Sequence, residues 1–176
     1  LRIASNLPPD QMVLCPYIFE MPIAPHIAAE KLGVHLDLQL MLKTYKQIHN
    51  QAEAVVVEGA GGFLVPLNAT ENLSDLAAEL HLPIIMVVGM RLGCINHALL
   101  TEEAIKSRHL KLAGWVANSL SSEMPYLEEN IKYLNSKLNA PLLGVIPPLS
   151  EALQKPIHAP YSIDALQYAA QHLSLP

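Results

Sequence analysis

Four short apolar runs recur along the chain at a nearly constant interval, and this recurrence limits the possible folds more than any other feature. The runs cover residues 54–57, 83–88, 111–116 and 141–146. Measured between Val55, Ile84, Leu112 and Leu142, the intervals are 29, 28 and 30 residues. Such an interval is the length of one βαβ unit. Because the runs are continuously apolar, we expect parallel strands that are buried on both faces.

The segments between these runs place apolar residues at helical spacing. Helices are expected over 25–32, 38–48, 70–80, 97–108, 125–138 and 161–173. Gly33 suits the left-handed position that ends the first of them. A chain of 176 residues is long enough for one domain. We therefore expect a single α/β domain over 1–176, an open, mainly parallel sheet with helices on both faces in three layers.

Charge and cysteine content exclude several classes of protein. The formal net charge is −5, so nucleic acid and anionic membranes are not expected partners. The apolar stretches are interrupted by proline, glycine or charge before they reach the length of a membrane span. Two cysteines, Cys15 and Cys94, are too few for a disulfide framework, which favours the reducing cytoplasm.

Polar or glycine-rich residues follow each of the four runs. Open parallel sheets bind ligands at the carboxyl ends of their strands. The residues at these ends are Glu58 with glycines in 59–62, the segment 89–97, Asn118 with Ser119, and Pro147 with Pro148 and Leu149. The sequence therefore predicts a ligand site along one edge of the sheet.

Glu58 is the acidic residue in this set, and two interpretations compete for it. A carboxylate at the end of a buried strand needs compensation, which a divalent metal beside nucleotide phosphates would provide. The glycines after it favour this interpretation, because a backbone approaches phosphate closely where side chains are missing. The alternative is a glutamate that caps the amides of the glycine-rich loop.

Two further segments also allow two interpretations each. The amides of 93–96 lead into a helix and suit an anion such as a carboxylate, or they form an ordinary turn with Asn96 as the N-cap. Asn118 either reads a nucleobase edge through its paired donor and acceptor or only shapes a turn. Cys94 has no other residue at a spacing typical of metal ligands, and the sequence does not predict nucleophilic catalysis by it.

Several segments match a known family in order and along most of the chain. They are 16–19 (PYIF), 25–26 (PH), 57–62 (VEGAGG), 92–97 (LGCINH), 114–118 (GWVAN) and 141–147 (PLLGVIP). Together they resemble dethiobiotin synthetase, the ATP-dependent carboxylase of biotin synthesis, which has a P-loop NTPase-like fold.

The resemblance implies a homodimeric cytoplasmic enzyme that joins 7,8-diaminopelargonate and CO2 with ATP and Mg2+. In that ligase chemistry a carbamate attacks ATP, a carbamic-phosphoric anhydride forms, and ring closure gives dethiobiotin.

The resemblance also implies a role for each matching residue. Glu58 corresponds to a magnesium ligand, and Gly59, Ala60 and Gly61 line the phosphate and substrate region. Asn118 and Ser119 correspond to the pair that reads adenine, and Pro147, Pro148, Leu149 and Gln154 to nucleotide contacts. Gly93, Cys94, Ile95 and Asn96 correspond to amides that hold the substrate carboxylate, contributed by the partner subunit.

One part of the family pattern is missing from the 176 residues. The family begins with a strand and a GxxxxGK[ST] loop, then a catalytic lysine and a magnesium-binding aspartate. Neither the loop nor those residues occur here, so no catalytic residue is assigned in this chain. Because positioning and electrostatics supply nearly all catalysis of phosphoryl transfer, we expect 1–176 to be inactive alone.

Two other functions remain open at this stage. One is a related P-loop ligase or amidotransferase that carboxylates nothing. The other is a catalytically silent fragment that only associates with itself.

Overall fold

A computed structural model describes residues 5–6, 13–121, 124–156 and 159–174. Contacts within the chain divide it into two compact units, Leu1–Leu82 and Pro83–Pro176. Each unit is described by itself, and a single domain over 1–176 stays a prediction. Within the described ranges, no helix has the length and apolar character needed to cross a membrane.

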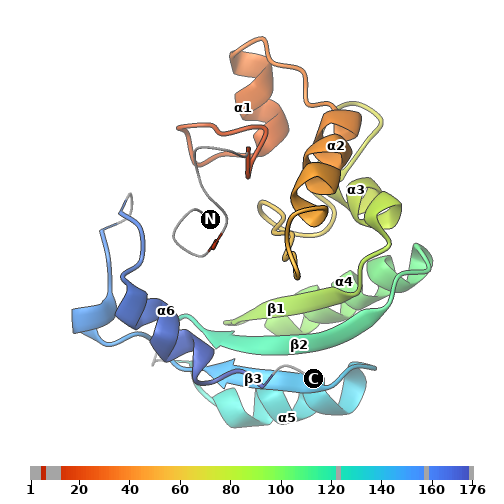
Figure 1. Cartoon of the computed structure of the whole chain (residues 1–176). Helices are drawn as coiled ribbons and strands as arrows, with labels where there is room; N and C mark the ends of the chain where they lie inside the picture. The colour runs from red at the N-terminus through yellow and green to blue at the C-terminus, as the bar shows by residue number, and fades with distance from the viewer. Residues whose placement is uncertain (1–4, 7–12, 122–123, 157–158, 175–176) are drawn as a thin grey trace. The chain divides into compact units, whose positions relative to one another are not determined.

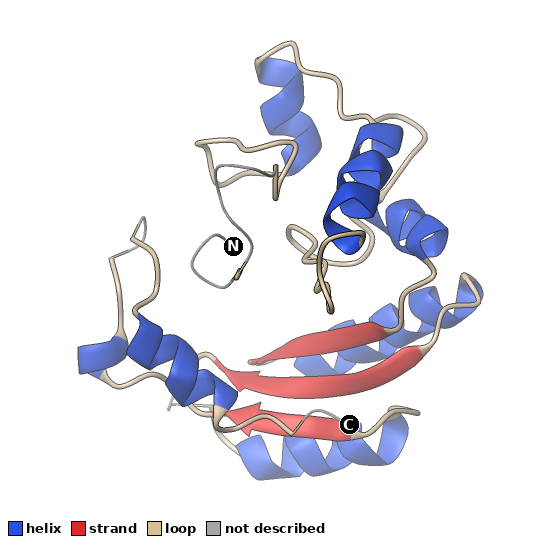
Figure 2. Cartoon of the chain, viewed as in Figure 1, coloured by secondary structure: helices blue, strands red, loops and turns tan. Residues whose placement is uncertain are grey.

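A parallel sheet forms the centre of the second unit. It contains β1 (Ile84–Met90), β2 (Leu112–Ser119) and β3 (Leu142–Ile146), in that order. Figure 2 shows the three arrows pointing the same way, as parallel pairing requires. These strands confirm three of the four apolar runs as strands, and the parallel sheet with helices confirms the predicted α/β fold class.

Helices connect and follow these strands (Figure 1). They are α4 (Cys94–Ser107), α5 (Leu127–Lys137) and α6 (Ile163–Ala170), with a short 3-10 helix, η2 (Glu151–Leu153), before α6. α4 packs on β1 and β2 and also contacts α5. α4 begins three residues earlier than predicted because Gly93, in a left-handed conformation, is its N-cap. Asn96 therefore lies inside the helix, and its expected role as N-cap is wrong.

Burial differs between the strands of the sheet. On β2 the run Gly114–Ala117 is buried throughout, as the continuous apolar pattern predicts. On β1 burial alternates, and Ile85 and Val87 are 48% and 60% exposed. The expectation of burial on both faces is thus wrong for β1. Within the second unit β1 is an edge strand, and burial depends on neighbouring elements as well as on composition.

The first unit is helical in its described part. It contains α1 (Pro25–Lys31), α2 (Leu38–His49) and α3 (Leu73–Leu80), close to the predicted ranges. Asp37 caps α2 by accepting a hydrogen bond from the Gln39 amide at 2.8 Å. Gly33 follows α1 with φ +65°, as its sequence position predicts. A buried cluster holds α2 and its neighbours together; its members are Ala29, Leu36, Leu38, Leu42 and Leu67.

The first apolar run, 54–57, is not a strand in this structure. Val56 is 92% exposed, so the expectation of a buried strand here is wrong. A strand needs hydrogen bonds from a neighbouring strand. The described residues of the first unit contain no such strand, and apolar composition alone does not provide those bonds.

Candidate functional site

The parallel register of the second unit brings several predicted site residues to one edge of the sheet. Met90 at the end of β1 pairs with Ser119 at the end of β2. Asn118 pairs with Gly89 on one side and with Ile146 on the other. The residues after β1 and β3 therefore leave the sheet beside Asn118 and Ser119. This edge carries the 93–96, 118–119 and 147–149 groups together.

The N-terminus of α4 begins after a glycine in a left-handed conformation. Gly93 adopts φ +92°, a region that residues with a Cβ rarely occupy. The His97 amide donates to the Gly93 carbonyl at 3.1 Å and closes the first turn. In an α-helix each amide donates to the carbonyl four residues earlier in the chain. For Ile95 and Asn96 that carbonyl lies before the helix begins, so these amides have no acceptor within it. Both amides can therefore donate to an anion, which the helix dipole also favours.

Cys94 lies at the first position of α4 and is buried. Its amide donates to the Arg91 carbonyl at 3.0 Å. The thiol is thus shielded, and the backbone is the part of this residue that shapes the turn.

Asn118 and Ser119 are the last two residues of β2 rather than the residues after it. Asn118 is half-buried, and its side chain carries both a donor and an acceptor. The Ser119 hydroxyl is buried, and within the described ranges it has no hydrogen-bond partner. Gly89 beside Asn118 presents no side chain, and the Leu120 side chain occupies that space, 3.2 Å from where a Cβ would lie.

The segment after β3 folds back on itself. The half-buried residues Pro147, Pro148 and Leu149 follow the strand directly. The side chain of Gln154 donates from Nε2 to the Leu149 carbonyl at 3.1 Å. The amides of Leu153 and Gln154 both donate to the Ser150 carbonyl, at 2.9 and 3.1 Å. Gln154 and the 147–149 segment, which the sequence analysis assigned to one ligand, are therefore linked by a direct contact.

Glu58 and the residues 59–61 belong to the first unit. Glu58 is exposed, and no strand precedes it. The argument that burial forces a metal onto this carboxylate is therefore wrong for this structure. Among the residues that the structure describes, no three His, Cys, Asp or Glu side chains cluster as a metal site. A single glutamate still fits Mg2+, which favours oxygen ligands and binds through one or two carboxylates, substrate phosphates and water.

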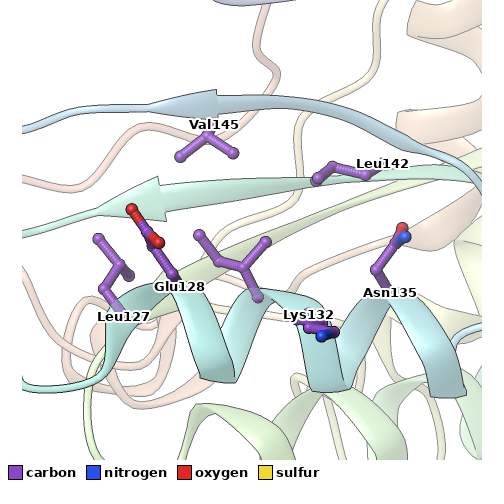
Figure 3. Close-up of a pocket in the computed structure, with 7 residues that line it drawn as sticks. Leu127, Glu128, Lys132, Asn135, Leu142 and Val145 are labelled. Atoms are coloured by element: carbon purple, nitrogen blue, oxygen red, sulfur yellow. The ribbon is translucent and has the colours of Figure 1, made fainter.

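Sequence reasoning missed a groove between α5 and β3 (Figure 3). It has a volume of about 520 Å³ and its lining residues are Leu127, Glu128, Ile131, Lys132, Asn135, Leu142 and Val145. Leu127 and Ile131 are both only half-buried in this groove. The spacing of Glu128, Lys132 and Asn135 along the same helix is the sequence pattern that could have indicated a mixed polar and apolar surface.

Comparisons with known proteins agree with these observations. A family model described as an AAA domain matches residues 2–155. The ATP-dependent dethiobiotin synthetase of Janthinobacterium sp. (strain Marseille) is 50% identical over 153 residues, which are 87% of this chain and 65% of that protein. The enzyme of the same name from Aromatoleum aromaticum is 49% identical over 152 residues, 86% of this chain and 68% of that protein.

The chain spans about two thirds of the length of the relatives that it matches. The match to the family model includes residues of both units, because it extends from residue 2 to residue 155. On this evidence the chain belongs to the AAA-domain family of proteins and, within it, to the dethiobiotin synthetases.

Proposed function

We propose that the complete protein is a cytoplasmic, ATP-dependent dethiobiotin synthetase that acts in biotin biosynthesis. Identity of about 50% to enzymes of that name supports the proposal. The structural observation that carries it is the pairing of Gly89, Asn118 and Ile146 across the sheet. The pairing supports the proposal because Asn118, which would read the base, lies beside the end of the strand that leads to the proposed anion site.

The nucleotide half of the site is assigned to the ends of β2 and β3. Asn118 and Ser119 would read the adenine, since an amide and a hydroxyl can both donate and accept. Pro147, Pro148 and Leu149 would lie beside the base, and the bond from Gln154 to Leu149 fixes the shape of that segment.

The substrate half is assigned to the start of α4. The amides around Gly93, Cys94, Ile95 and Asn96 would hold the carboxylate of 7,8-diaminopelargonate. In the proposed homodimer each subunit contributes these amides to the site of its partner. Light scattering on the complete protein tests this assembly, and a monomer that turns over normally would contradict it.

Glu58 is the residue proposed to hold Mg2+, with Gly59, Ala60 and Gly61 beside the phosphates and substrate. When bound, the ion would neutralise charge that develops on the transferred phosphoryl group. Glu58 would contribute a carboxylate oxygen and the glycine-rich backbone would contribute amides. The chemistry of these donors supports the assignment.

The proposed reaction consumes ATP to activate CO2. One amine of the substrate captures CO2 as a carbamate, and a carbamate oxygen attacks the γ-phosphate with loss of ADP. The second amine then attacks the carbonyl of the carbamic-phosphoric anhydride, closes the ureido ring and releases phosphate. Residues 1–176 would bind and orient the reactants. We expect no turnover from them alone, since the P-loop and its lysine do not occur among these residues.

The direct test supplies the complete protein with diaminopelargonate, bicarbonate and Mg-ATP. Dethiobiotin detected by mass spectrometry is the expected result, and its absence would refute the proposal. ATP hydrolysis that depends on glutamine would instead indicate an amidotransferase relative. Isothermal calorimetry on residues 1–176 tests the alternative that this chain is a silent fragment that only associates with itself. Tight binding of Mg-ATP would contradict that alternative.

A further inference from the structure

The backbone of 172–174 lies against the outer edge of β3. Gly144 and Leu173 form an antiparallel bridge, and the Ser174 amide donates to the Leu143 carbonyl at 2.8 Å. Within the second unit, β2 occupies the other edge of β3. The end of the chain therefore covers an edge that would otherwise carry unpaired backbone groups.

An irregularity in β3 creates the place where this segment docks. Trp115 pairs with Leu142 and the next residue, Val116, pairs with Gly144, so Leu143 is an extra residue in the ladder. Such a bulge interrupts the regular pairing of the strand. The Leu143 carbonyl is the group that accepts from Ser174.

Gly144 permits this contact because it has no side chain. A Cβ built at this position collides with the His172 carbonyl oxygen and lies 3.0 Å from the carbonyl carbon. Both atoms are backbone, so a side chain at 144 displaces 172–174. The glycine is thus required by close approach of two backbones rather than by an unusual φ.

The same segment is joined to the end of α6. The amides of His172 and Leu173 donate to the carbonyls of Ala169 and Ala170, at 3.2 and 3.1 Å. A ring nitrogen of His172 lies 2.8 Å from the Tyr168 carbonyl, and the two rings contact each other at a tilt of 56° with centroids 4.8 Å apart. α6 therefore cannot move far while 172–174 stays on β3.

We infer that residues 172–174, which we name the edge clamp, position the nucleotide segment 147–154. That segment leaves β3 directly after Ile146, and the chain returns through α6 to Gly144 on the same strand. Fixing both ends reduces the conformations open to the residues between them. The inference rests on the proposed function for its ligand, a nucleoside triphosphate, and makes Gly144 a positioning residue.

The test is Gly144→Ala in the complete protein, followed by hydrogen exchange at single amides. Exchange at Ser174 should rise at least about tenfold as the edge clamp is released. Exchange at Leu153 and Gln154, whose amides donate to Ser150, should rise with it. If the binding-competent population falls to about a tenth, the Kd for ATP rises about tenfold.

Two further variants keep the test decisive. A protein that ends at residue 171 lacks the edge clamp and should show the same fast exchange at Leu153 and Gln154. Adding Gly144→Ala to it should change nothing more, because the colliding carbonyl is gone. His172→Ala keeps that carbonyl and should not relieve the effect of Gly144→Ala.

The outcomes separate this inference from the proposed function. Fast exchange at Ser174 with unchanged exchange at Leu153 and Gln154 overturns the inference, as does unchanged protection of Ser174 in Gly144→Ala. A third outcome is that the wild-type protein binds no ATP while the amides of Leu153, Gln154 and Ser174 all exchange faster in Gly144→Ala. That result refutes the nucleotide site and leaves the role of the edge clamp intact.

Discussion

The buried carboxylate of Glu102 in α4 accepts a hydrogen bond at 2.8 Å from the amide of Asn139, 37 residues further along the chain. Asn139 lies between α5 and β3, so this bond ties α4 to the connection that starts the last strand. Lys106 also contacts Glu102, at 3.1 Å, but its side chain is 54% exposed. The bond to Asn139 is therefore the part of this arrangement that matters for stability.

Replacing Glu102 should destabilise the fold through this bond. Glu102→Ala leaves the Asn139 amide without its acceptor and should lower the free energy of unfolding by about 1–3 kcal/mol. Glu102→Gln keeps an acceptor oxygen and should cost less. Urea denaturation measures both, with the exposed neighbour Glu103→Ala as control, expected within about 0.5 kcal/mol of wild type. Equal losses in Glu102→Ala and Glu103→Ala would contradict this role.

Gly93→Ala should weaken binding of the substrate carboxylate. Alanine at φ +92° is strained, so the first turn of α4 should shift and misplace its amides. We expect the KM for diaminopelargonate to rise on the order of tenfold, with the KM for ATP nearly unchanged. Gly33→Ala, at φ +65° after α1, is the matched control because it strains the backbone away from this helix. A rise only in the KM for ATP would show that the anion site is misassigned.

Asn118→Asp should change nucleotide preference. A carboxylate cannot donate, so the variant loses one of the two complementary contacts to adenine. Discrimination in favour of ATP over GTP should fall by about 1–3 kcal/mol, or roughly fivefold to 150-fold. The ratio of kcat/KM for the two nucleotides measures it. Asn135→Asp, at an exposed residue of the groove between α5 and β3, supplies the same charge change without the contact. An equal effect there would argue against base reading.

Glu58→Gln should weaken the binding of magnesium. The amide keeps the shape of the side chain but is a poorer ligand, so turnover should fall on the order of a hundredfold or more. Titration of activity with Mg2+ should show a higher half-saturating concentration. Glu53→Gln, another exposed glutamate of the same unit, serves as the control. An unchanged magnesium titration in Glu58→Gln would remove this residue from the metal site.

The sequence predicted the second unit better than the first for a physical reason. The runs that begin β1, β2 and β3 are followed by helices of the expected period, and parallel pairing completes each ladder. Pairing extends β1 to Met90 and β2 to Ser119, beyond the apolar runs. The run 54–57 is similarly apolar, but no strand lies beside it among the described residues of its unit. The composition of a run indicates whether it could be buried as a strand. The hydrogen bonds that make it a strand must come from another segment, which the composition of the run does not reveal.

The candidate site follows the same division. Parallel pairing sets Asn118 beside the ends of β1 and β3, which the rule for carboxyl ends of parallel strands led us to expect. The start of α4 was missed by three residues because Gly93, not Asn96, ends the turn. The bulge at Leu143 and the contact at Gly144 depend on residues 172–174, far along the chain, and no local pattern indicates them.

The most direct test of the account follows the carbon of CO2 into the product. The complete protein is incubated with isotopically labelled bicarbonate, diaminopelargonate and Mg-ATP, and dethiobiotin and ADP are quantified together. If the complete protein is a carboxylating ligase, labelled dethiobiotin and ADP form in equal amounts, and neither forms when the diamine is omitted. ADP formed without labelled dethiobiotin would contradict the assignment of this chain to a carboxylating ligase.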